Sequence, residues 1–276
     1  MKTHDQWLVS DRLWERIEPL LPVHVPPPHP LGCHRHRVDN REALNGIFFV
    51  LRTGAPWKSL DVTGICSGST AHARFQEWRN AGVFARLWEE ALNEYDELKG
   101  LDWEWLAMDG AMTKAPLGGG KTGPNPTDRG KRGVKRSLLT EAEGIPVGIA
   151  VEGANRNDMK MVKDTLQSVP ESVELKRCRT NGKQGMCMDK GYDSEEVRHL
   201  VEAFGYTAHI RARGEEAQAI KKEAGFKARR WVVERTHSWM NRFRRILIRW
   251  EKKPENYLAL LHFACAVITY NACQFG

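Results

Sequence analysis

The chain has 276 residues, of which 41% are hydrophobic and 28% charged. This balance excludes a disordered polypeptide, and the length predicts one large domain or two modest ones. No stretch approaches the ~18 apolar residues of a membrane span, and the N-terminal residues lack the apolar core of a secretion signal, so we expect a cytoplasmic protein. The six cysteines contain no CxxC pair and are expected to be reduced thiols.

The net charge of +7 is distributed unevenly along the chain. Residues 1–113 contain 12 Lys/Arg against 16 Asp/Glu, whereas residues 114–136 contain 7 against 1 and residues 227–253 contain 10 against 2. One such window alone is as typical of a solvated helix face or a loop as it is of a contact with nucleic acid. Two basic windows in an otherwise acidic chain favour a polyanionic partner, and therefore nucleic acid.

The first part of the chain has helical periodicity. Apolar residues recur at helical spacing over residues 5–21 and again over 39–53, where Asp39 or Asn40 is the expected cap. The Pro- and His-rich segment 22–37 lies between them and cannot form regular structure. Its histidines and cysteine match no standard zinc-ligand spacing, so we do not expect a metal site there.

Residues 67–98 predict two further helices. Ser67 or Ser69 is the expected cap of the first, and Asn80-Ala81-Gly82 is the expected break before the second. Two helices joined by a short turn are compatible with a helix-turn-helix DNA reader, and equally with a helical bundle that packs on the rest of the chain. If this region reads DNA, the candidate contacts on the helix after Ser69 are His72, Arg74 and Arg79.

The pattern changes after Gly100 to alternating strands and helices. This order predicts an α/β fold with a mixed sheet flanked by helices. The expected strands are 102–110, two joined by a turn within 134–154, 185–191 and 206–213. The expected helices are 158–169, 194–205, 228–250 and 255–273.

Two acids stand at matching positions in the predicted sheet. Asp109 and Asp189 each follow a short apolar run, and we expect each at the C-terminal end of a buried strand, where open α/β sheets bind ligands. If the two strands are neighbours, both carboxylates can bind the same cations, and Mg²⁺ prefers such oxygen ligands. The alternative for either residue alone is a plain Asp-Gly turn.

Glu234 lies in the second basic window. On a helix, it falls about 200° from Val232 and so opposite the apolar stripe, on a face shared with Arg230, Asn241 and Arg245. An acid on so basic a face either pairs with Arg230 or Arg235, or is a third metal ligand on a helix that also contacts phosphates.

These acids and their surroundings resemble the DDE transposases of the bacterial insertion sequence five family. The segments that carry the resemblance keep the family's order over nearly the whole chain. They are LNGIFFVLRTGAPWKSL, AMDGAMTKAP, GKTGPNPTDRGKRGVKRSLLTEAEGIPVGIAVEGANRNDMKM, MDKGYDS and RRWVVERTHSWMNRFRRILIRWEKKPENYLALLHFACAVI.

The resemblance implies a ribonuclease-H-like catalytic domain in which Asp109, Asp189 and Glu234 bind two Mg²⁺ or Mn²⁺ ions. The family surrounds its Glu with Tyr-x2-Arg-x3-Glu-x6-Lys. Arg230 matches the Arg, but Lys227 and Asn241 stand at the Tyr and Lys positions, so Arg242 or Arg245 is the expected substitute for the Lys. Only 44 residues separate Asp189 from Glu234, which leaves no room for a large inserted domain.

The resemblance also implies a division of labour and a set of partners. We expect a helical DNA-binding domain at residues 1–98, a catalytic domain at 99–276, and a homodimer on double-stranded DNA that carries terminal inverted repeats or the target site, near the nucleoid. The expected DNA contacts are basic or amide side chains. They are Arg74, Arg79, Lys121, Arg129, Lys131, Arg132, Lys135, Arg230, Arg235, Asn241, Arg242 and Arg245.

Two other functions share parts of this pattern. A structure-selective nuclease of the same fold would have the three carboxylates and would make no DNA joins. A DNA-binding regulator would account for the basic windows and the helix-turn-helix candidate, but not for an acid on a cationic helix face.

Overall fold

The computed structural model describes residues 7–25, 36–180, 182, 184–210 and 231–274. Its first part is helical, and local sequence signals set the helix ends. Asp39 accepts from the backbone N–H groups of Arg41 and Glu42, and Ser67 accepts from that of Thr70, so both predicted caps are confirmed. The helices are α1 (Asp11–Ile17), η2 (Glu18–Leu20), α2 (Asn40–Thr53), η3 (Trp57–Val62), α3 (Gly68–Asn80) and α4 (Val83–Lys99).

A mixed sheet follows, in the order β2-β3-β1-β5-β6, with β4 on β3. Strands β1, β3 and β4 are antiparallel neighbours, whereas β5 runs parallel to β1 and β6 parallel to β5. The strands are β1 (Trp105–Lys114), β2 (Gly123–Pro124), β3 (Arg132–Thr140), β4 (Pro146–Gly153), β5 (Gly185–Met188) and β6 (Thr207–Ile210).

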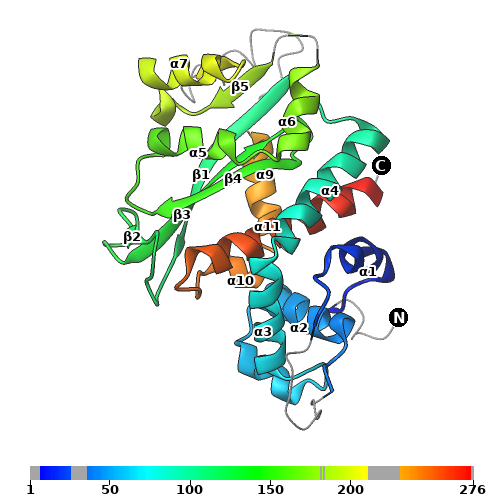
Figure 1. Ribbon diagram of the computed structural model, residues 1–276. Helices are drawn as coiled ribbons and strands as arrows, with labels where there is room; N and C mark the ends of the chain where they lie inside the picture. Colours follow the sequence, from blue (N-terminus) through cyan, green and yellow to red (C-terminus); the bar gives the residue numbers. More distant parts are fainter. Residues whose placement is uncertain (1–6, 26–35, 181, 183, 211–230, 275–276) are drawn as a thin grey trace.

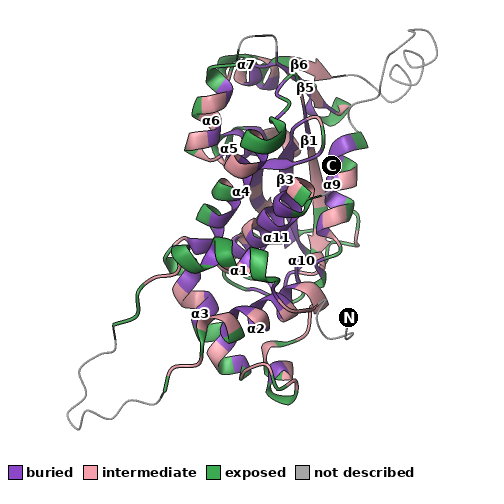
Figure 2. Cartoon of the chain, turned by 90° about the vertical axis from the view of Figure 1, so that its right-hand side faces the viewer, coloured by how far each residue is buried: buried purple, intermediate pink, exposed green. Residues whose placement is uncertain are grey.

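Helices cover both faces of this sheet, as Figures 1 and 2 show from two directions. Helices α5, α6 and α7 lie on one side and α9 on the other. The mixed sheet flanked by helices, preceded by a helical region, was predicted and is confirmed. The remaining helices are η4 (Asp158–Met161), α5 (Val162–Gln167), α6 (Glu171–Cys178), η5 (Lys190–Tyr192), α7 (Glu195–Ala203), α9 (Trp231–Met240), α10 (Arg244–Leu247) and α11 (Pro254–Gln274).

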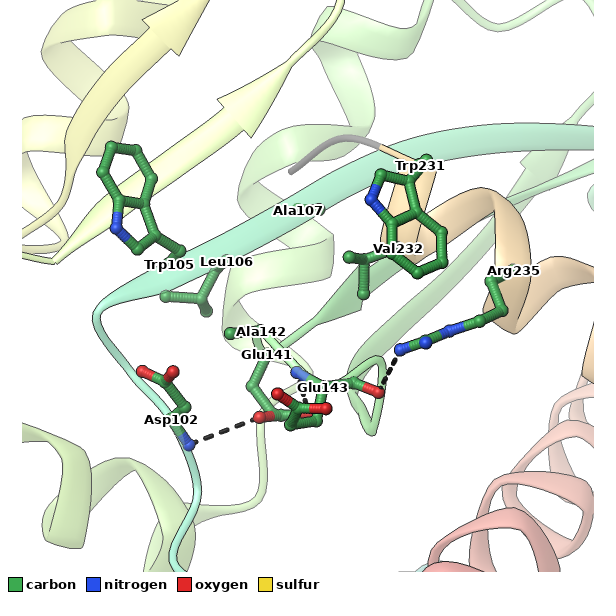
Figure 3. Close-up of a pocket in the computed structure, with 10 residues that line it drawn as sticks. All are labelled: Asp102, Trp105, Leu106, Ala107, Glu141, Ala142, Glu143, Trp231, Val232 and Arg235. Carbon is green, nitrogen blue, oxygen red and sulfur yellow. Dashed lines mark hydrogen bonds between the residues drawn. The ribbon is translucent and has the colours of Figure 1, made fainter. Parts of the chain in front are cut away.

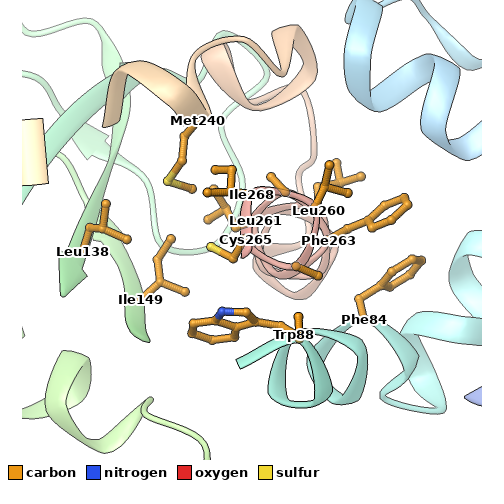
Figure 4. Packing of buried hydrophobic residues seen from close by; sticks show 14 of the residues in the cluster. Phe84, Trp88, Leu138, Ile149, Met240, Leu260, Leu261, Phe263, Cys265 and Ile268 are labelled. Carbon is orange, nitrogen blue, oxygen red and sulfur yellow. The ribbon is translucent and has the colours of Figure 1, made fainter. Parts of the chain in front are cut away.

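Helix α11 is the centre of the hydrophobic core. It packs on α4 and also touches α3, α9 and β4, so the two parts of the chain share one core. Figure 4 shows Phe84 and Trp88 of α4 against α11, and the Trp88 Nε1 donates to the Pro146 carbonyl of β4 at 3.0 Å. The expected boundary after residue 98 therefore falls at the end of a helix whose buried face packs on the last helix of the chain.

The prediction that no stretch approaches a membrane span was wrong for α11. Its 21 residues have the length and composition of a span, with a mean hydropathy of 1.2 in the most apolar window. However, 67% of that window is buried inside the protein. Burial of this kind is what the central helix of a core requires.

Two predicted element boundaries were wrong. Strand β1 does not end at an Asp109-Gly110 turn but continues to Lys114, because it pairs with β3 as far as Lys114↔Gly133. The helix expected over 228–250 ends at Met240 and is followed by the separate short helix α10. The Arg249 N–H donates to the Lys114 carbonyl at 2.8 Å, and this contact with the end of β1 is incompatible with a continuous helix.

Candidate active site

The register of β1 and β5 brings the first two predicted acids together. The strands are parallel, with Ala107 level with Cys187. Asp109 and Asp189 each lie two residues further on, and side chains two apart on a strand share a face. Asp189 still has an extended backbone and accepts from the Gly191 N–H at 2.8 Å. The two carboxylates therefore stand side by side on one face of the sheet, although Asp109 lies in the middle of its strand and not at the predicted end.

Helix α9 carries the third predicted acid and packs on the same sheet. It packs on β1 and β3 through Val232, Val233, Thr236, His237 and Met240, while Glu234 is exposed. The Thr236 Oγ1 donates to the Gly144 carbonyl at 2.6 Å and ties the helix to the turn between β3 and β4. The predicted position of Glu234, opposite Val232, is therefore confirmed.

The charges near Asp109 include the other predicted acids. Burial, and then the carboxylates of Asp189, Glu234 and Asp158, together raise the pKa of Asp109 to about 6, against one lowering hydrogen bond from the Gly110 N–H. Burial and then the charges of Asp158, Asp109 and Asp189 also raise the pKa of Tyr192 well above its usual value. Carboxylates gathered this way repel one another unless a cation lies between them.

The donor set suits a hard cation, because all three predicted ligands offer carboxylate oxygens. Within the described ranges, no group of three His, Cys, Asp or Glu side chains is spaced closely enough to hold an ion. In this part of the chain, Asp109, Asp189 and Glu234 therefore do not form a closed coordination shell.

The sequence analysis missed a fourth acid, Asp158, and assigned its partner, Lys135, to DNA binding. The buried Lys135 was expected to contact DNA, but its Nζ donates to Asp158 Oδ2 and to the Arg156 carbonyl, both at 2.8 Å. Asp158 Oδ1 is buried without a partner and lies 2.2 Å from where a Cβ on Gly110 would be. Gly110, which follows Asp109, therefore leaves room for the Asp158 carboxylate because it has no side chain. The GANRND segment quoted for the family resemblance contains Asp158 and was the available signal.

His237 is a second residue that the sequence analysis missed. It is 7% exposed and lies one turn after Glu234, with its ring against the Asp109 main chain. Neither ring nitrogen makes a hydrogen bond of ordinary geometry within the part of the chain that is described. Burial, and then the positive charge of Arg136, lowers the pKa of His237 to about 3, so the ring is neutral.

Several predicted DNA contacts are buried and committed elsewhere, which corrects the prediction. Arg245 is 7% exposed and its Nε donates to Glu251 Oε1 at 2.7 Å. Arg74 is 5% exposed and donates to Glu77 and to the Val38 carbonyl. With Lys135, these are three of the predicted contacts that cannot reach a phosphate from the inside of the protein.

The other predicted contacts lie at or near the surface. Lys121 pairs with Glu152 at 3.0 Å, and Asn241 accepts from Arg136 at 2.6 Å. Arg79 is half-buried at the end of α3. Arg230 lies outside the described residues. The predicted cations with exposed residues and no ion pair in the described ranges are Arg129, Lys131, Arg132 and Arg242.

A cleft of about 360 Å³ lies where β1 begins and α9 starts, and its lining includes none of the three predicted acids (Figure 3). Arg235 lines it with its guanidinium between the rings of Trp231 and Trp239, at 4.6 and 4.8 Å, and donates to the Glu143 carbonyl. On the opposite side, the buried Glu141 accepts from the backbone N–H groups of Glu143 and Ile145 in its own turn and of Asp102 before β1. Arg235 thus ties the turn to α9, and Glu141 ties it to the segment before β1.

Comparisons with known proteins agree on one family. The family model described as "Transposase DDE domain" matches residues 104–269, and that described as "Putative transposase of IS4/5 family" matches residues 9–88. The "Putative transposase for insertion sequence element IS402" of Burkholderia cepacia is 36% identical over 154 residues, which are 56% of this chain and 71% of the relative. The "Insertion element IS402 uncharacterized 16.2 kDa protein" of the same organism is 39% identical over 123 residues, 43% of this chain and 81% of the relative.

Among solved structures, the catalytic domain of Mos1 mariner transposase aligns with 69% of this chain and 91% of its own, at 10% identity. The TM-score is 0.30, too low to carry an argument.

Proposed function

The chain belongs to the family of transposases with a DDE domain, and we propose that it cuts DNA at the ends of an insertion sequence and joins the freed 3′-hydroxyl to target DNA. Three acids from β1, the end of β5 and α9 would carry out both steps at one site. The observation that supports this proposal is the parallel pairing of β1 and β5, which puts Asp109 and Asp189 on one face of a sheet on which α9, the helix of Glu234, also packs. Burial, and then the charges of Asp189 and Glu234, raise the pKa of Asp109 accordingly.

Asp109, Asp189 and Glu234 would hold two Mg²⁺ or Mn²⁺ ions. When bound, such ions lower the pKa of a water molecule and stabilise the leaving 3′ oxygen. The chain's own contribution is geometric. The β1–β5 pairing would hold the two aspartates relative to each other, and the buried Val233 and Thr236 would hold α9, which carries Glu234, against the sheet. The neutral His237 fills the space between α9 and β1 without adding a charge to the site.

The proposed partners are the terminal inverted repeats of the element and the target DNA, bound by a homodimer in the bacterial cytoplasm, near the nucleoid. Residues 1–98 would read the ends and residues 99–276 would catalyse. The exposed cations of the loop after β2, which include Arg129 and Lys131, support binding to a phosphate backbone.

Cleavage of duplex DNA that carries the ends of the encoding element, with Mg²⁺ or Mn²⁺, tests this proposal. Asp109→Asn, Asp189→Asn and Glu234→Gln should each abolish cleavage and leave DNA binding intact, because phosphate contacts come from Lys and Arg. Glu143→Gln, a change at an exposed acid in the turn after β3, is the matched control and should cut normally.

The products separate the two candidate activities. Joined products with target DNA support a transposase mechanism, whereas cleavage without any joining would indicate a structure-selective nuclease. Near-normal cutting by one of the three variants would remove that residue from the site.

A further inference from the structure

A groove of about 680 Å³ lies where the helical region meets the end of the sheet. Three elements that are far apart in the sequence line it: the end of α3, the loop before β2 and the start of α11. Its cationic side chains are Arg79, Lys252 and Lys253, and its one acid is Glu255. Lys252 and Lys253 are exposed, and none of the three cations has an ion-pair partner in the described part of the chain.

The buried Arg249 joins the two loops that line this groove. Its side chain is 0% exposed and donates to four backbone carbonyls, two from each of two loops. The partners are Glu251 at 2.8 Å, Gly120 at 2.7 Å, Lys121 at 3.1 Å and Lys252 at 3.3 Å. A guanidinium has five N–H donors in a fixed plane, so it can hold both loops at once.

The two loops that Arg249 joins also contact each other directly. The Gly120 N–H donates to the Lys252 carbonyl at 3.1 Å, and a Cβ on Gly119 would lie 2.1 Å from the same carbonyl oxygen. Gly119 also has a φ of +111°, which other residues rarely adopt. The backbone that presents Lys252 and Lys253 is therefore fixed, although their side chains extend into solvent.

Arg79 closes the groove from the helical side. Its guanidinium donates to the side-chain oxygens of Asn80 and of Asn256 in α11. Both partners are neutral amides, so the positive charge of Arg79 is held in place and not cancelled.

We propose that this groove, formed by Arg79, Lys252 and Lys253, grips the phosphate backbone of duplex DNA away from the cutting site. The inference rests on the proposed function. The Arg249 N–H donates to the carbonyl of Lys114, the last residue of β1. Lys114 is five residues past Asp109, roughly 17 Å along the strand, so Arg249 bonds the sheet away from the predicted acids.

The test is the salt dependence of binding to a 40-base-pair duplex of random sequence, measured by fluorescence anisotropy. The variant Lys252→Ala/Lys253→Ala should lose about two phosphate contacts. The slope of log affinity against log salt should then become shallower by about 1.8, and affinity at 0.15 M salt should fall roughly 30-fold. Both side chains are exposed, so the fold should be unaffected.

The matched control is Lys163→Ala/Arg179→Ala, which removes the same charge from α5 and the end of α6, on the opposite side of the sheet from α9 (Figure 2). Both residues are exposed, and neither has an ion-pair partner in the described part of the chain. It should keep the wild-type slope. If both double variants change the slope equally, only the total charge matters and the inference is overturned. A wild-type slope in the Lys252→Ala/Lys253→Ala variant would overturn it as well. If the wild-type protein does not bind the duplex at all, the proposed function fails instead.

Arg249→Lys tests the role of the buried guanidinium. It should weaken binding in the wild-type background and add little in the Lys252→Ala/Lys253→Ala background, because it acts through those lysines. An equal additional loss in both backgrounds would show that Arg249 does not act by presenting them.

Discussion

Replacing Arg245 with alanine is expected to destabilise the fold, and not to remove a contact with DNA. The side chains of Arg245 and its partner Glu251 are only 9% and 5% exposed, and their nitrogen and oxygen atoms are 2.7 Å apart. Loss of the guanidinium leaves a buried carboxylate without its cation, which typically costs about 3–5 kcal/mol. That is a large share of the ~5–15 kcal/mol by which a domain is stable.

Urea denaturation followed by tryptophan fluorescence measures this loss. The paired replacement Arg245→Met with Glu251→Leu is the control. It should recover most of the free energy of unfolding, because both charges leave the interior together. The reasoning would be refuted if Arg245→Ala stayed within about 0.5 kcal/mol of wild type while the salt dependence of DNA binding became shallower. That outcome would mean that Arg245 reaches phosphate.

Three further predictions follow from buried groups near the site. Gly110→Ala places a methyl group 2.2 Å from Asp158 Oδ1 and should lower the free energy of unfolding by about 1–3 kcal/mol. The loss should be smaller in an Asp158→Ala background. A coupling energy below about 0.5 kcal/mol in this double-mutant cycle would contradict the clash. Burial raises the pKa of Glu141 from 4.5 to about 7, so its neutral form stabilises the fold fully below pH 4.5, and this contribution, roughly 3 kcal/mol, is lost as the pH rises through 7. The free energy of unfolding of wild type should therefore fall relative to Glu141→Gln over that range, and parallel pH curves would count against it. His237→Ala should reduce cleavage more than DNA binding, since α9 loses its contact with β1, and normal cleavage would show that this contact does not set the position of Glu234.

Features that depend on local sequence could be predicted. The caps at Asp39 and Ser67 follow from side chains that reach backbone N–H groups two or three residues ahead, and such contacts need no tertiary information. The exposed position of Glu234 followed from helical periodicity over one short stretch, which α9 retains. The proximity of Asp109 and Asp189 required only that two strands be neighbours.

Features that depend on distant parts of the chain could not be predicted. The apolar periodicity continues past Met240, yet the helix ends there because Arg249 bonds the end of β1 and the Thr113 hydroxyl donates to the Leu247 carbonyl. Likewise, charge counts cannot say which way a side chain points. Lys135 belongs to a basic window by sequence, but its side chain is buried and donates to Asp158 of η4.

The two basic windows are therefore less basic on the surface than their composition suggests. Lys135, Arg136, Arg245 and Arg249 are all buried, and each holds other parts of the chain in place. The basic residues of these windows thus fall into two groups: buried cations that bond other parts of the chain, and exposed cations on the surface. Arg249 connects the two groups, because a buried cation in one window fixes the loops that expose Lys252 and Lys253. A basic window in such a chain therefore contains both cations that stabilise the fold and cations that would contact DNA. Only the burial of each side chain shows which of the two roles it has.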